Sequence, residues 1–503
     1  MAPLVIKRDR EHRLHLGDCP GILAREGAFG RESRDDGLAL LFGLDERLLV
    51  GDRQCTLAVA VAPALVSTAA TPRSRGCGPG LGVNTRQTGP AIAMRLGEDV
   101  DDRLLDLLAV AGANERPVDL SDDLVDLSLH RGAADATFTS WTPAPGTWPL
   151  PRHDPANTAH SPTASPPRNP PTVRTVVSAA TVANRPRFAP LVGTDHVATY
   201  GSGLVVMPRA GETVALERDA PTPLAGFGPD NRLHTVGADG ADGPATVVGY
   251  GTADLREAYR TPLRDDNPQG LTVGSREVYV GCESGAVRAV DPESGRRWRV
   301  DGAMPALVDG RLYATDAPLD GTVAYAPRTG LDRRLEAGPE RTWSAGPTDG
   351  FPHPPAVADG RLVLGTYAEG GGVVAAVDTE SGDYLWEPRP LGRNVATPAV
   401  VGDRGYTAVE TGDGTGVVMA IDLATGETRW RDEVEWRVST PVVGGDTLLV
   451  AGERGDGTGA VRAYDMDGDV LWTHAFEAVT PGGLAPVEDR VLVTVGATLY
   501  ELV

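Results

Sequence analysis

The sequence predicts an all-β protein in which residues 172–503 form an eight-bladed β-propeller of four-stranded antiparallel blades, preceded by an N-terminal extension of unassigned fold. The 503 residues include 62 glycines and 41 prolines but only 5% aromatic residues. This balance favours many turns and short strands over long helices. A strand-turn pattern also recurs with a period of about 40 residues, as expected of a propeller blade.

Each repeat combines a strand, a hairpin, a second strand, an Asp-x-x-(Ser/Thr)-Gly turn and a last strand. The aspartate can accept hydrogen bonds from the amides that follow it, and glycine takes the positive φ that reverses the chain. The last strand ends in tryptophan in four of the five plainest copies, and these rings are expected to pack blade against blade. The tryptophans are Trp298, Trp386, Trp430 and Trp472, and the copies are Gly285–Gly295, Gly321–Gly330, Gly372–Gly382, Gly416–Gly426 and Gly459–Asp469.

Fainter copies at Gly211–Glu217, Thr246–Gly251 and Gly496–Val503 bring the expected number of blades to eight. The turns of successive copies then begin at positions 217, 251, 291, 326, 378, 422, 465 and 503. Because the last copy ends after its third strand, Thr172–Ser178 is predicted to supply its outer strand. Closing the ring with strands from both ends removes the exposed edges that an open stack of sheets would present.

The chain is predicted to divide into three regions. Residues 1–141 show no repeat, residues 142–171 form a Pro-rich segment, and residues 172–503 form the propeller. Within the first region, Asp101–Val110 and Asp119–Leu127 read as helices with acidic first turns. The apolar run Thr56–Ala70 is too short for a membrane span of about 20 residues, although it has the length of a signal-peptide core.

Two interpretations of the N-terminal region stay open. Residues 1–141 are either a small separate domain, or the start is misassigned, so that part of 1–80 is not native sequence and Val50 is an alternative start. Cys77 then stands where a lipoprotein cysteine would. The protein is expected to be soluble as written, and extracytoplasmic or lipid-anchored at the cell surface if the true start lies downstream of Met1.

The charge excludes one class of partner and indicates a habitat. With 47 basic and 69 acidic residues the net charge is -22, which repels nucleic acids and anionic lipids. Lys7 is the only lysine, and an acidic, lysine-poor composition suggests a salt-adapted protein whose self-repulsion is screened at high ionic strength. The four cysteines, Cys19, Cys55, Cys77 and Cys282, show no CxxC spacing, so neither a zinc site nor a disulfide framework is predicted.

The repeats resemble the pyrroloquinoline-quinone-like (PQQ-like) β-propeller repeat family, in a salt-adapted, haloarchaeal-type form. Ala420–Trp430 is the best match to its Ala-x-Asp-x-x-Thr-Gly turn and following tryptophan, and Trp148–Ala159 is similar to the lead that opens many members. The resemblance covers 148–503. The resemblance implies one of two kinds of protein. The quinoprotein dehydrogenases of this fold hold a cofactor over the central channel with calcium, a catalytic aspartate and often an adjacent-cysteine disulfide. Other members resemble assembly scaffolds.

This chain departs from the dehydrogenase pattern. It has no Cys-Cys pair, Cys282 is the only cysteine within the repeats, and no Asp or Glu can be matched to the metal ligands. We therefore predict a non-enzymatic scaffold that recognises a protein or cell-envelope component through one face of the ring. No catalytic residue, metal or cofactor is predicted, and PQQ with calcium belongs only to the alternative, a quinoprotein dehydrogenase. The protein is expected to be a monomer without a transmembrane segment.

Other candidate sites have a structural interpretation beside the functional one. Gly412–Gly416 and Gly455–Gly459 are expected to be hairpin tips rather than phosphate or calcium loops, since no Gly-Lys-(Ser/Thr) follows them. Asp465–Asp469 occupies the repeat turn and lacks the further ligands of a calcium loop. His12 and His15 are a close pair without a third ligand, and His153 and His160 are expected to cap the lead motif. Arginine and apolar side chains at the ring centre would favour the scaffold, and a carboxylate-amide cluster the dehydrogenase.

Overall fold

The computed structural model describes five strands before residue 138, and then residues 138–503 except 178–187, 212–213, 219–220, 239–243, 252, 264–266, 294–296, 309, 317–320, 329–338, 347–350, 412–413, 478–480 and 497. The chain separates into two compact units, Met1–Asp126 and Leu127–Val503. The predicted helices at 101–110 and 119–127, together with His12, Cys19, Val50 and Cys77, lie outside the described residues.

The first unit contains a five-stranded sheet with the strand order β2-β1-β3-β4-β5. All of its described pairs are antiparallel. Cys55 and the start of the predicted apolar run lie in its fourth strand. The strands are β1 (Leu4–Arg8), β2 (Leu14–Leu16), β3 (Leu38–Leu44), β4 (Cys55–Ala60) and β5 (Ile92–Leu96).

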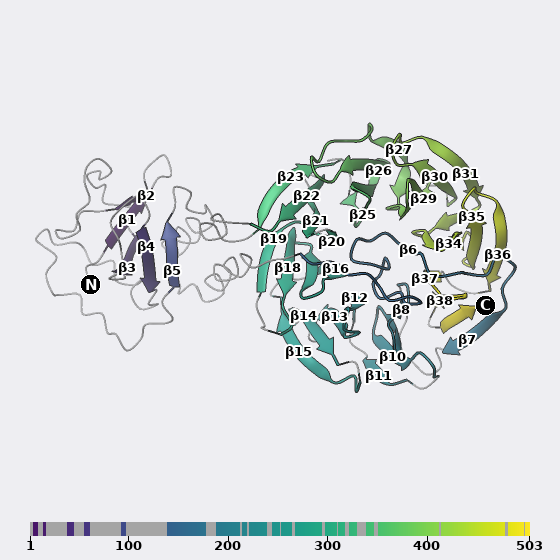
Figure 1. Cartoon of the computed structure of the whole chain (residues 1–503), viewed down its shortest axis with the longest axis horizontal. Helices are drawn as coiled ribbons and strands as arrows, with labels where there is room; N and C mark the ends of the chain where they lie inside the picture. Colours follow the sequence, from purple (N-terminus) through teal and green to yellow (C-terminus); the bar gives the residue numbers. More distant parts are fainter. Residues whose placement is uncertain are drawn as a thin grey trace, which may run out of the picture. The chain divides into compact units, whose positions relative to one another are not determined.

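The second unit is a ring of antiparallel sheets, each with its first strand nearest the axis (Figure 1). The first strands contact one another in chain order, and the last of them contacts the first, which closes the ring. In blades 1 to 4 the strands follow one another from the axis outwards. These are β8 (Leu191–Val192), β9 (His196–Tyr200), β10 (Leu204–Pro208) and β11 (Leu216–Arg218); β12 (Leu224–Phe227), β13 (Leu233–Ala238), β14 (Ala245–Tyr250) and β15 (Glu257–Pro262); β16 (Pro268–Val273), β17 (Val278–Cys282), β18 (Ala286–Val290) and β19 (Arg297–Asp301); β20 (Pro305–Val308), β21 (Arg311–Asp316), β22 (Gly321–Ala326) and β23 (Glu340–Ala345).

Blades 5 to 7 add short strands where the chain passes from one blade to the next. The long strand β26 doubles back on itself, since the Val373 amide donates to Thr366 Oγ1 at 3.0 Å. Blades 5 and 6 share one eight-stranded sheet because β27 pairs with both β26 and β29. The strands are β24 (Phe351–Pro352), β25 (Ala356–Ala358), β26 (Arg361–Asp378) and β27 (Arg389–Val395); β28 (Ala399–Val401), β29 (Arg404–Glu410), β30 (Gly416–Asp422) and β31 (Thr428–Val434); β32 (Trp436–Val438), β33 (Val442–Gly444), β34 (Thr447–Arg454), β35 (Gly459–Asp465) and β36 (Val470–Phe476).

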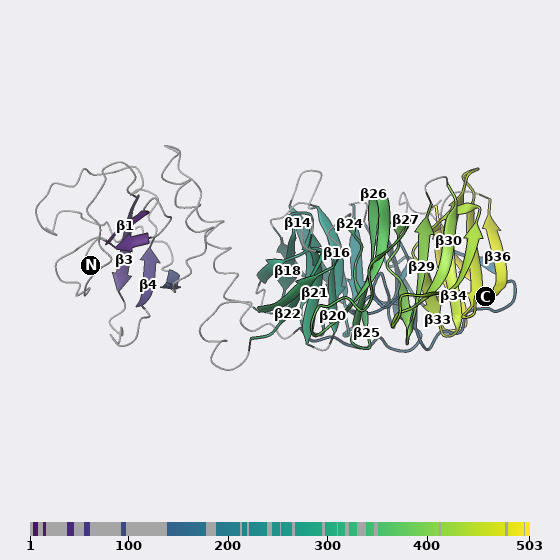
Figure 2. The same cartoon turned by 90° about the horizontal axis from the view of Figure 1, so that it is seen from above.

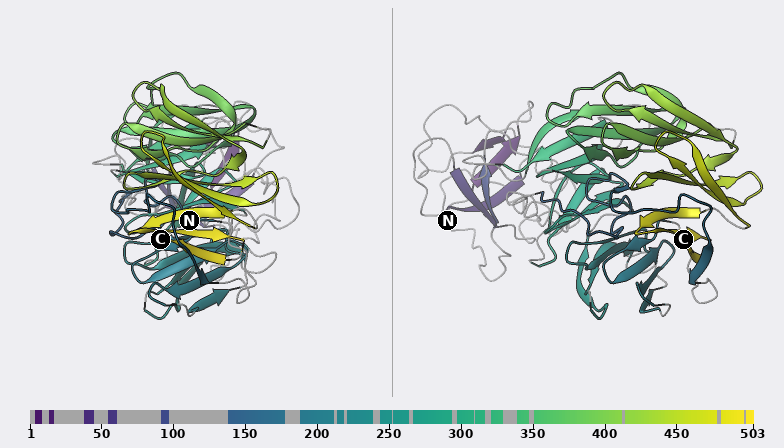
Figure 3. Two further views of the ribbon diagram at one scale, coloured as in Figure 1. Left: turned by 90° about the vertical axis from the view of Figure 1, so that its right-hand side faces the viewer. Right: turned by 45° about the vertical axis from the view of Figure 1, so that its right-hand side comes forward.

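Blade 8 is built from both ends of the propeller. Strands β37 (Pro481–Val487), β38 (Arg490–Val495) and β39 (Thr498–Leu502) come from the C-terminus, and β7 (Val173–Val177) pairs with β39 as the outer strand. The yellow C-terminal strands accordingly lie beside the blue strands that begin the ring (Figure 3). The outer strand expected at Thr172–Ser178 is therefore found here as β7.

Among the described residues every regular element is a strand, and the all-β propeller prediction is confirmed. One copy of the repeat was placed wrongly. In blade 1 the third strand is β10, so its turn begins at Pro208 rather than at 217, and Leu216 and Glu217 belong to the outer strand β11. The apolar residues of β10 are buried, and β10 is the strand that the Gly-x-x-Val pattern at 211–214 led us to expect further along the chain. The spacing from 208 to 251 is 43 residues, closer to that of the later blades.

Neighbouring blades are joined by one repeated contact between a tryptophan and the next turn. The Asp422 side chain accepts the amides of Ala424 (2.9 Å) and Thr425 (3.1 Å), which fixes the turn. The Trp386 indole donates to the Leu423 carbonyl at 3.0 Å. A Cβ added to Gly426, which has φ +74, would lie 2.6 Å from the Trp386 ring. Glycine is required there both for the backbone and for the packing.

The same contact joins other blades and includes a tryptophan that the repeat analysis missed. Trp430 donates to the Met466 carbonyl at 3.1 Å, and Trp343 of blade 4 donates to the Thr379 carbonyl at 2.9 Å. Trp343 escaped notice because the insertion between β22 and β23 moves it away from the expected spacing. These rings therefore pack blade against blade, which is the role expected of the repeat tryptophans.

Candidate functional site

The segment 142–171, called the lead segment below, crosses the centre of the ring at the end where β20, β25 and β33 lie (Figures 1 and 2). Its carbonyl groups accept hydrogen bonds from the first strands of blades 1, 2, 4, 5, 6 and 7. First strands have one edge facing the axis, and their amides need acceptors when water is excluded. The donors are Val192, Phe227, Leu307, Val357, Val400 and Val443, and the acceptors are Trp148, Pro149, Pro155, Ala156, Thr158 and Ala159.

The lead motif turns the chain so that it meets successive blades. His153, Asn157 and Ala159 have φ of 74, 59 and 54, an uncommon conformation for residues with a side chain. The Asn157 amide donates to the carbonyls of Pro305 and Pro355, each at 3.1 Å, and so joins blades 4 and 5. Asp154 accepts the Thr158 amide at 3.0 Å. The Asp-x-x-Asn-Thr pattern therefore holds the lead segment against the first strands of the ring.

The predicted capping histidines have different surroundings. His153 Nδ1 lies 3.2 Å from the Asp154 carboxylate. His160 belongs to β6 (His160–Ser161), which pairs in parallel with β33 of blade 7. Burial, followed by the nearby His153, lowers the pKa of His160, which favours its neutral form.

Arg152 is the charged residue that the lead segment places at the ring centre. Its Nη2 donates to the Pro398 carbonyl, which precedes β28 of blade 6, at 2.8 Å. Nε donates to the Asn157 carbonyl at 2.9 Å. Arg152 is 8% exposed, and burial lowers its pKa to about 10 while Asp154 raises it. The guanidinium remains a cation at neutral pH.

His353 lies near enough to this cation to be affected by its charge, and it contacts Asn394. His353 Nε2 and Asn394 Oδ1 are 2.8 Å apart. Burial is the main cause that lowers the pKa of His353, and the charge of Arg152 lowers it further. The imidazole is therefore neutral at pH 7. His353 and Asn394 could not be predicted from the sequence, because they are 201 and 242 positions from Arg152 and belong to no repeat motif.

The residues at the centre do not fit the calcium-bound quinone of the dehydrogenases. Calcium prefers carboxylate and carbonyl oxygens, and a second cation, Arg152, would repel it. Within the described part of the chain no group of three His, Cys, Asp or Glu side chains is placed to hold a metal ion. Cys282 is buried in β17 of blade 3, and its thiol lies 3.9 Å from the Val280 carbonyl.

A second candidate surface lies at the opposite end of blades 5 to 7. In blade 5, β25 pairs with the start of β26 and receives the lead segment, whereas β24 pairs further along β26, before it doubles back, with Phe351 opposite Tyr367. The corresponding positions in blades 6 and 7 include Asn394 opposite Glu410 and Arg437 opposite Glu453. We call Phe351, Tyr367, Arg393, Glu410 and Arg437 the blade 5–7 rim; strands β24, β26 and β27, which carry the first three, are labelled near the upper edge of Figure 2.

The blade 5–7 rim combines aromatic and charged groups. Phe351 is 67% exposed, and its ring centroid lies 6.5 Å from that of Tyr367. The Arg393 guanidinium stacks on Tyr367 at 5.6 Å and donates to its hydroxyl at 3.0 Å. Arg437 lies 3.7 Å from Glu410. An exposed aromatic group with arginine beside it and an ion pair around it has the composition of a protein-binding surface.

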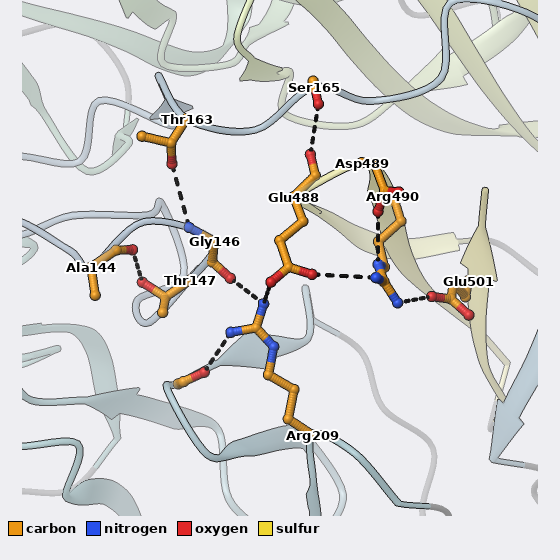
Figure 4. Close-up of polar contacts among 11 residues, drawn as sticks. Ala144, Gly146, Thr147, Thr163, Ser165, Arg209, Glu488, Asp489, Arg490 and Glu501 are labelled. Carbon is orange, nitrogen blue, oxygen red and sulfur yellow. Dashed lines mark hydrogen bonds and ion pairs between the residues drawn. The ribbon is translucent and has the colours of Figure 1, made fainter.

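The seam between blades 8 and 1 is polar and involves the lead segment. Arg209, which follows β10, donates to the Gly146 carbonyl and to Glu488 Oε1, each at 2.7 Å (Figure 4). Glu488 belongs to the turn between β37 and β38, and its carbonyl accepts the Ser165 hydroxyl at 3.3 Å. Arg490 pairs with Glu501 inside blade 8.

The remaining sequence candidates lie in turns. Gly455–Gly459 joins β34 to β35, whereas residues 412–413 of the Gly412–Gly416 candidate lie outside the described residues. In the 455–459 loop Asp456 accepts the Thr458 amide at 2.9 Å, as hairpin tips often do. Asp465 accepts the amides of Asp467 (3.0 Å) and Asp469 (2.9 Å), so its carboxylate serves the repeat turn. His12 and the side chain of His15 lie outside the described residues.

Comparison with known proteins supports the propeller. The model of a family described as outer membrane protein assembly factor BamB matches residues 320–475. No curated protein matches the sequence. The described residues include no helix with the length and apolar character of a membrane span.

Among solved structures, the chain is similar to the computationally designed Ika8 protein, with 14% identity, 65% of this chain and 99% of that chain covered, and a TM-score of 0.50. The quinohemoprotein alcohol dehydrogenase ADHIIG from Pseudomonas putida HK5 is 13% identical, covers 71% of this chain and 80% of its own, and has a TM-score of 0.51. BamB from Moraxella catarrhalis is 17% identical, with coverages of 66% and 98% and a TM-score of 0.46. The resemblance to PQQ-like propellers is confirmed, at the level of the fold.

Proposed function

We propose that this PQQ-like β-propeller is a non-enzymatic scaffold that binds a protein partner through the blade 5–7 rim. The observation that carries the proposal is Phe351, which is 67% exposed on a rim that also presents Tyr367 and Arg393. Exposing a large aromatic side chain to water is unfavourable, and buried aromatic residues dominate the energy of protein interfaces.

The two ends of the ring differ in a way that favours this rim. At the opposite end, the lead segment already occupies the first strands and provides acceptors for their amides. The blade 5–7 rim instead carries an ion pair, Glu410 with Arg437, whose arginine is 63% exposed. Polar groups around an aromatic centre are the usual anatomy of a non-obligate protein interface.

The family description supports a partner in the cell envelope, since the model that matches 320–475 is named for outer membrane protein assembly. We extend the proposal accordingly to an envelope protein. The chain acts in this proposal as a monomer, with no nucleic acid and no cofactor.

Arg152 argues against the alternative, a PQQ- and calcium-dependent dehydrogenase, because its positive charge would repel the calcium ion. Titrating the full chain with PQQ in high-salt buffer, with and without calcium, tests it. Saturable binding near one per chain that requires calcium would replace the scaffold proposal. Absence of a calcium-dependent signal at micromolar protein is the expected result.

The scaffold proposal is tested by replacing Phe351 with a photo-crosslinking phenylalanine analogue in the full chain. A matched control carries the analogue at Val470, which is 49% exposed on the outer strand β36. We expect a discrete envelope protein to be crosslinked from position 351 and not from 470. The identified protein is then purified and titrated against wild type, Phe351→Ser and Val470→Ser. Loss of a central aromatic contact weakens such complexes by roughly 30-fold or more, and equal affinity of the two variants would contradict the proposal.

A further inference from the structure

Arg152 is a buried cation whose charge has no carboxylate against it. Its guanidinium donates only to the carbonyls of Asn157 and Pro398. Among the described residues no carboxylate lies within ion-pair distance of it. Only 8% of the Arg152 surface is exposed. A buried charge is costly unless it is paired, so the ring centre is electrostatically incomplete.

The carboxylate of Asp154 raises the pKa of Arg152, but its oxygens form hydrogen bonds with other residues. They accept the Thr158 amide and hydroxyl, and one of them faces His153 Nδ1. Asp154 therefore moderates the charge of Arg152 from a distance without neutralising its donors.

The neighbours of Arg152 are also donors or neutral groups. His353 is held against Asn394 at 2.8 Å, and the Asn157 amide is committed to blades 4 and 5. Among the described residues no acceptor meets Arg152 Nη1. A buried cation thus keeps a donor that no described acceptor uses, and its charge acts on the neutral His353.

We propose that the ring centre binds a carboxylate through Arg152, with His353 and Asn394 beside the bound group. The planar guanidinium matches the geometry of a carboxylate, and a charge-assisted hydrogen bond in a water-poor site is strong. A carboxylate is favoured over a phosphate because a single cation with two donors already in use balances one negative charge. The carboxylate belongs either to a small free acid or to an acidic residue of a bound protein.

Acetate and acetamide, which share a shape and differ in charge, test the site without any knowledge of a partner. The full chain is titrated with each at constant ionic strength, and the thermal unfolding midpoint is followed. A ligand that binds only the folded chain raises its stability by mass action. We expect a saturable rise with acetate and none with acetamide. Equal responses to the two probes would overturn the proposal.

Substitution then assigns the effect to Arg152. In Arg152→Gln the acetate response is expected to weaken at least tenfold in apparent affinity, while Arg152→Lys keeps a charge with poorer geometry and loses less. The control is Arg256→Gln, whose side chain is 86% exposed. If Arg152→Gln does not fold, His353→Gln and Arg152→Lys still decide, because an acetate affinity unchanged in both would overturn the site.

Peptides separate the two sources of the carboxylate. A heptapeptide with one central glutamate, amidated and acetylated at its ends, is compared with its glutamine counterpart. Acetate competing with the glutamate peptide places the acidic residue of a protein at Arg152. Acetate binding with no peptide binding assigns the site to small free acids. Because neither arm involves the blade 5–7 rim, failure here leaves the Phe351 experiment unaffected, and the reverse also holds.

Discussion

Two kinds of joint hold the ring, one inside the repeats and one at the seam where the chain closes on itself. Between blades 4 and 7, Trp343, Trp386 and Trp430 each dock on the turn of the next blade. Trp472 of blade 7 has a different partner. Its indole donates instead to the Pro167 carbonyl of the lead segment at 2.7 Å.

The difference shows how a repeat protein solves closure with a non-repeating segment. The lead segment supplies the acceptor for Trp472 and the acceptors for the first strands, and β7, which follows it in the chain, is the outer strand of blade 8. At the other side of the seam, the link from blade 8 to blade 1 is the polar group of Arg209 and Glu488 (Figure 4). We therefore expect the seam to depend on one continuous segment and on salt, and the inner joints on local packing.

The largest effect is expected from Trp472→Ala. The ring is 3% exposed, and removing a buried tryptophan costs about 3–5 kcal/mol of unfolding free energy. Denaturant unfolding measures the loss. Hydrogen exchange should show lost protection in β7 and β39, because Trp472 anchors the segment that precedes β7.

Trp430→Ala is the matched change inside the repeats. Its ring is only half-buried, so the loss should be smaller, and lost protection should be confined to the turn at 465–469. If Trp472→Ala left β7 as protected as in the wild type, the lead segment would be anchored by something other than this joint.

A pH effect separates a histidine within a blade from one in the lead segment. His234 of blade 2 lies 2.7 Å from the Tyr259 hydroxyl, and burial lowers its pKa to about 4. Below pH 6.5 the unfolded chain takes up a proton that the folded chain refuses, so stability falls as pH drops towards 4, by about 3 kcal/mol. His234→Gln should remove this loss. His160→Gln in the lead segment should remove a smaller one, because burial also lowers that pKa.

Unfolding free energies at pH 7.5 and pH 5 measure both effects. The wild type should lose stability between these values, and the His234→Gln chain should lose less. An unchanged pH dependence in His234→Gln would mean that the folded chain protonates this imidazole as readily as the unfolded chain does.

The sequence was informative wherever the structure repeats. The Asp-x-x-(Ser/Thr)-Gly turn and its tryptophan predicted the propeller and the packing between blades, since each copy meets the same neighbour. The spacing failed at Trp343, displaced by an insertion, and at blade 1, where the pattern at 211–214 led us to expect the third strand further along the chain. A further signal was present and unused, namely a proline followed by two apolar residues in the first strands, as in Pro305-Ala-Leu307 and Pro398-Ala-Val400.

The ring centre could not be predicted from periodicity. The lead segment has no copy of itself, so no comparison between repeats reports what it touches. Arg152 meets Pro398 at a separation of 246 residues, a contact that depends on closure of the whole ring. The motif at Asp154 to Thr158 suggested a family, but its contact with blades 4 and 5 required coordinates.

The smallest effect, and the sharpest test of the polar seam, is expected from Arg209→Gln. Its ion pair with Glu488 is half exposed, with side-chain exposures of 24% and 49%, and such pairs are worth about 0–1 kcal/mol. Because the Debye length falls from about 10 Å at 0.1 M to about 3 Å at 1 M salt, the loss should shrink as salt rises. The loss in Trp472→Ala should persist. Arg429→Gln, which removes two partly exposed ion pairs inside blade 6, with Asp403 and Asp422, is the control: its loss should also be small and salt-dependent, yet leave the exchange of β7 unchanged. Faster exchange of β7 and β37 in Arg209→Gln alone would locate the weak joint of the ring at the seam, whereas equal exchange in both variants would show that the lead segment holds blade 8 without this pair.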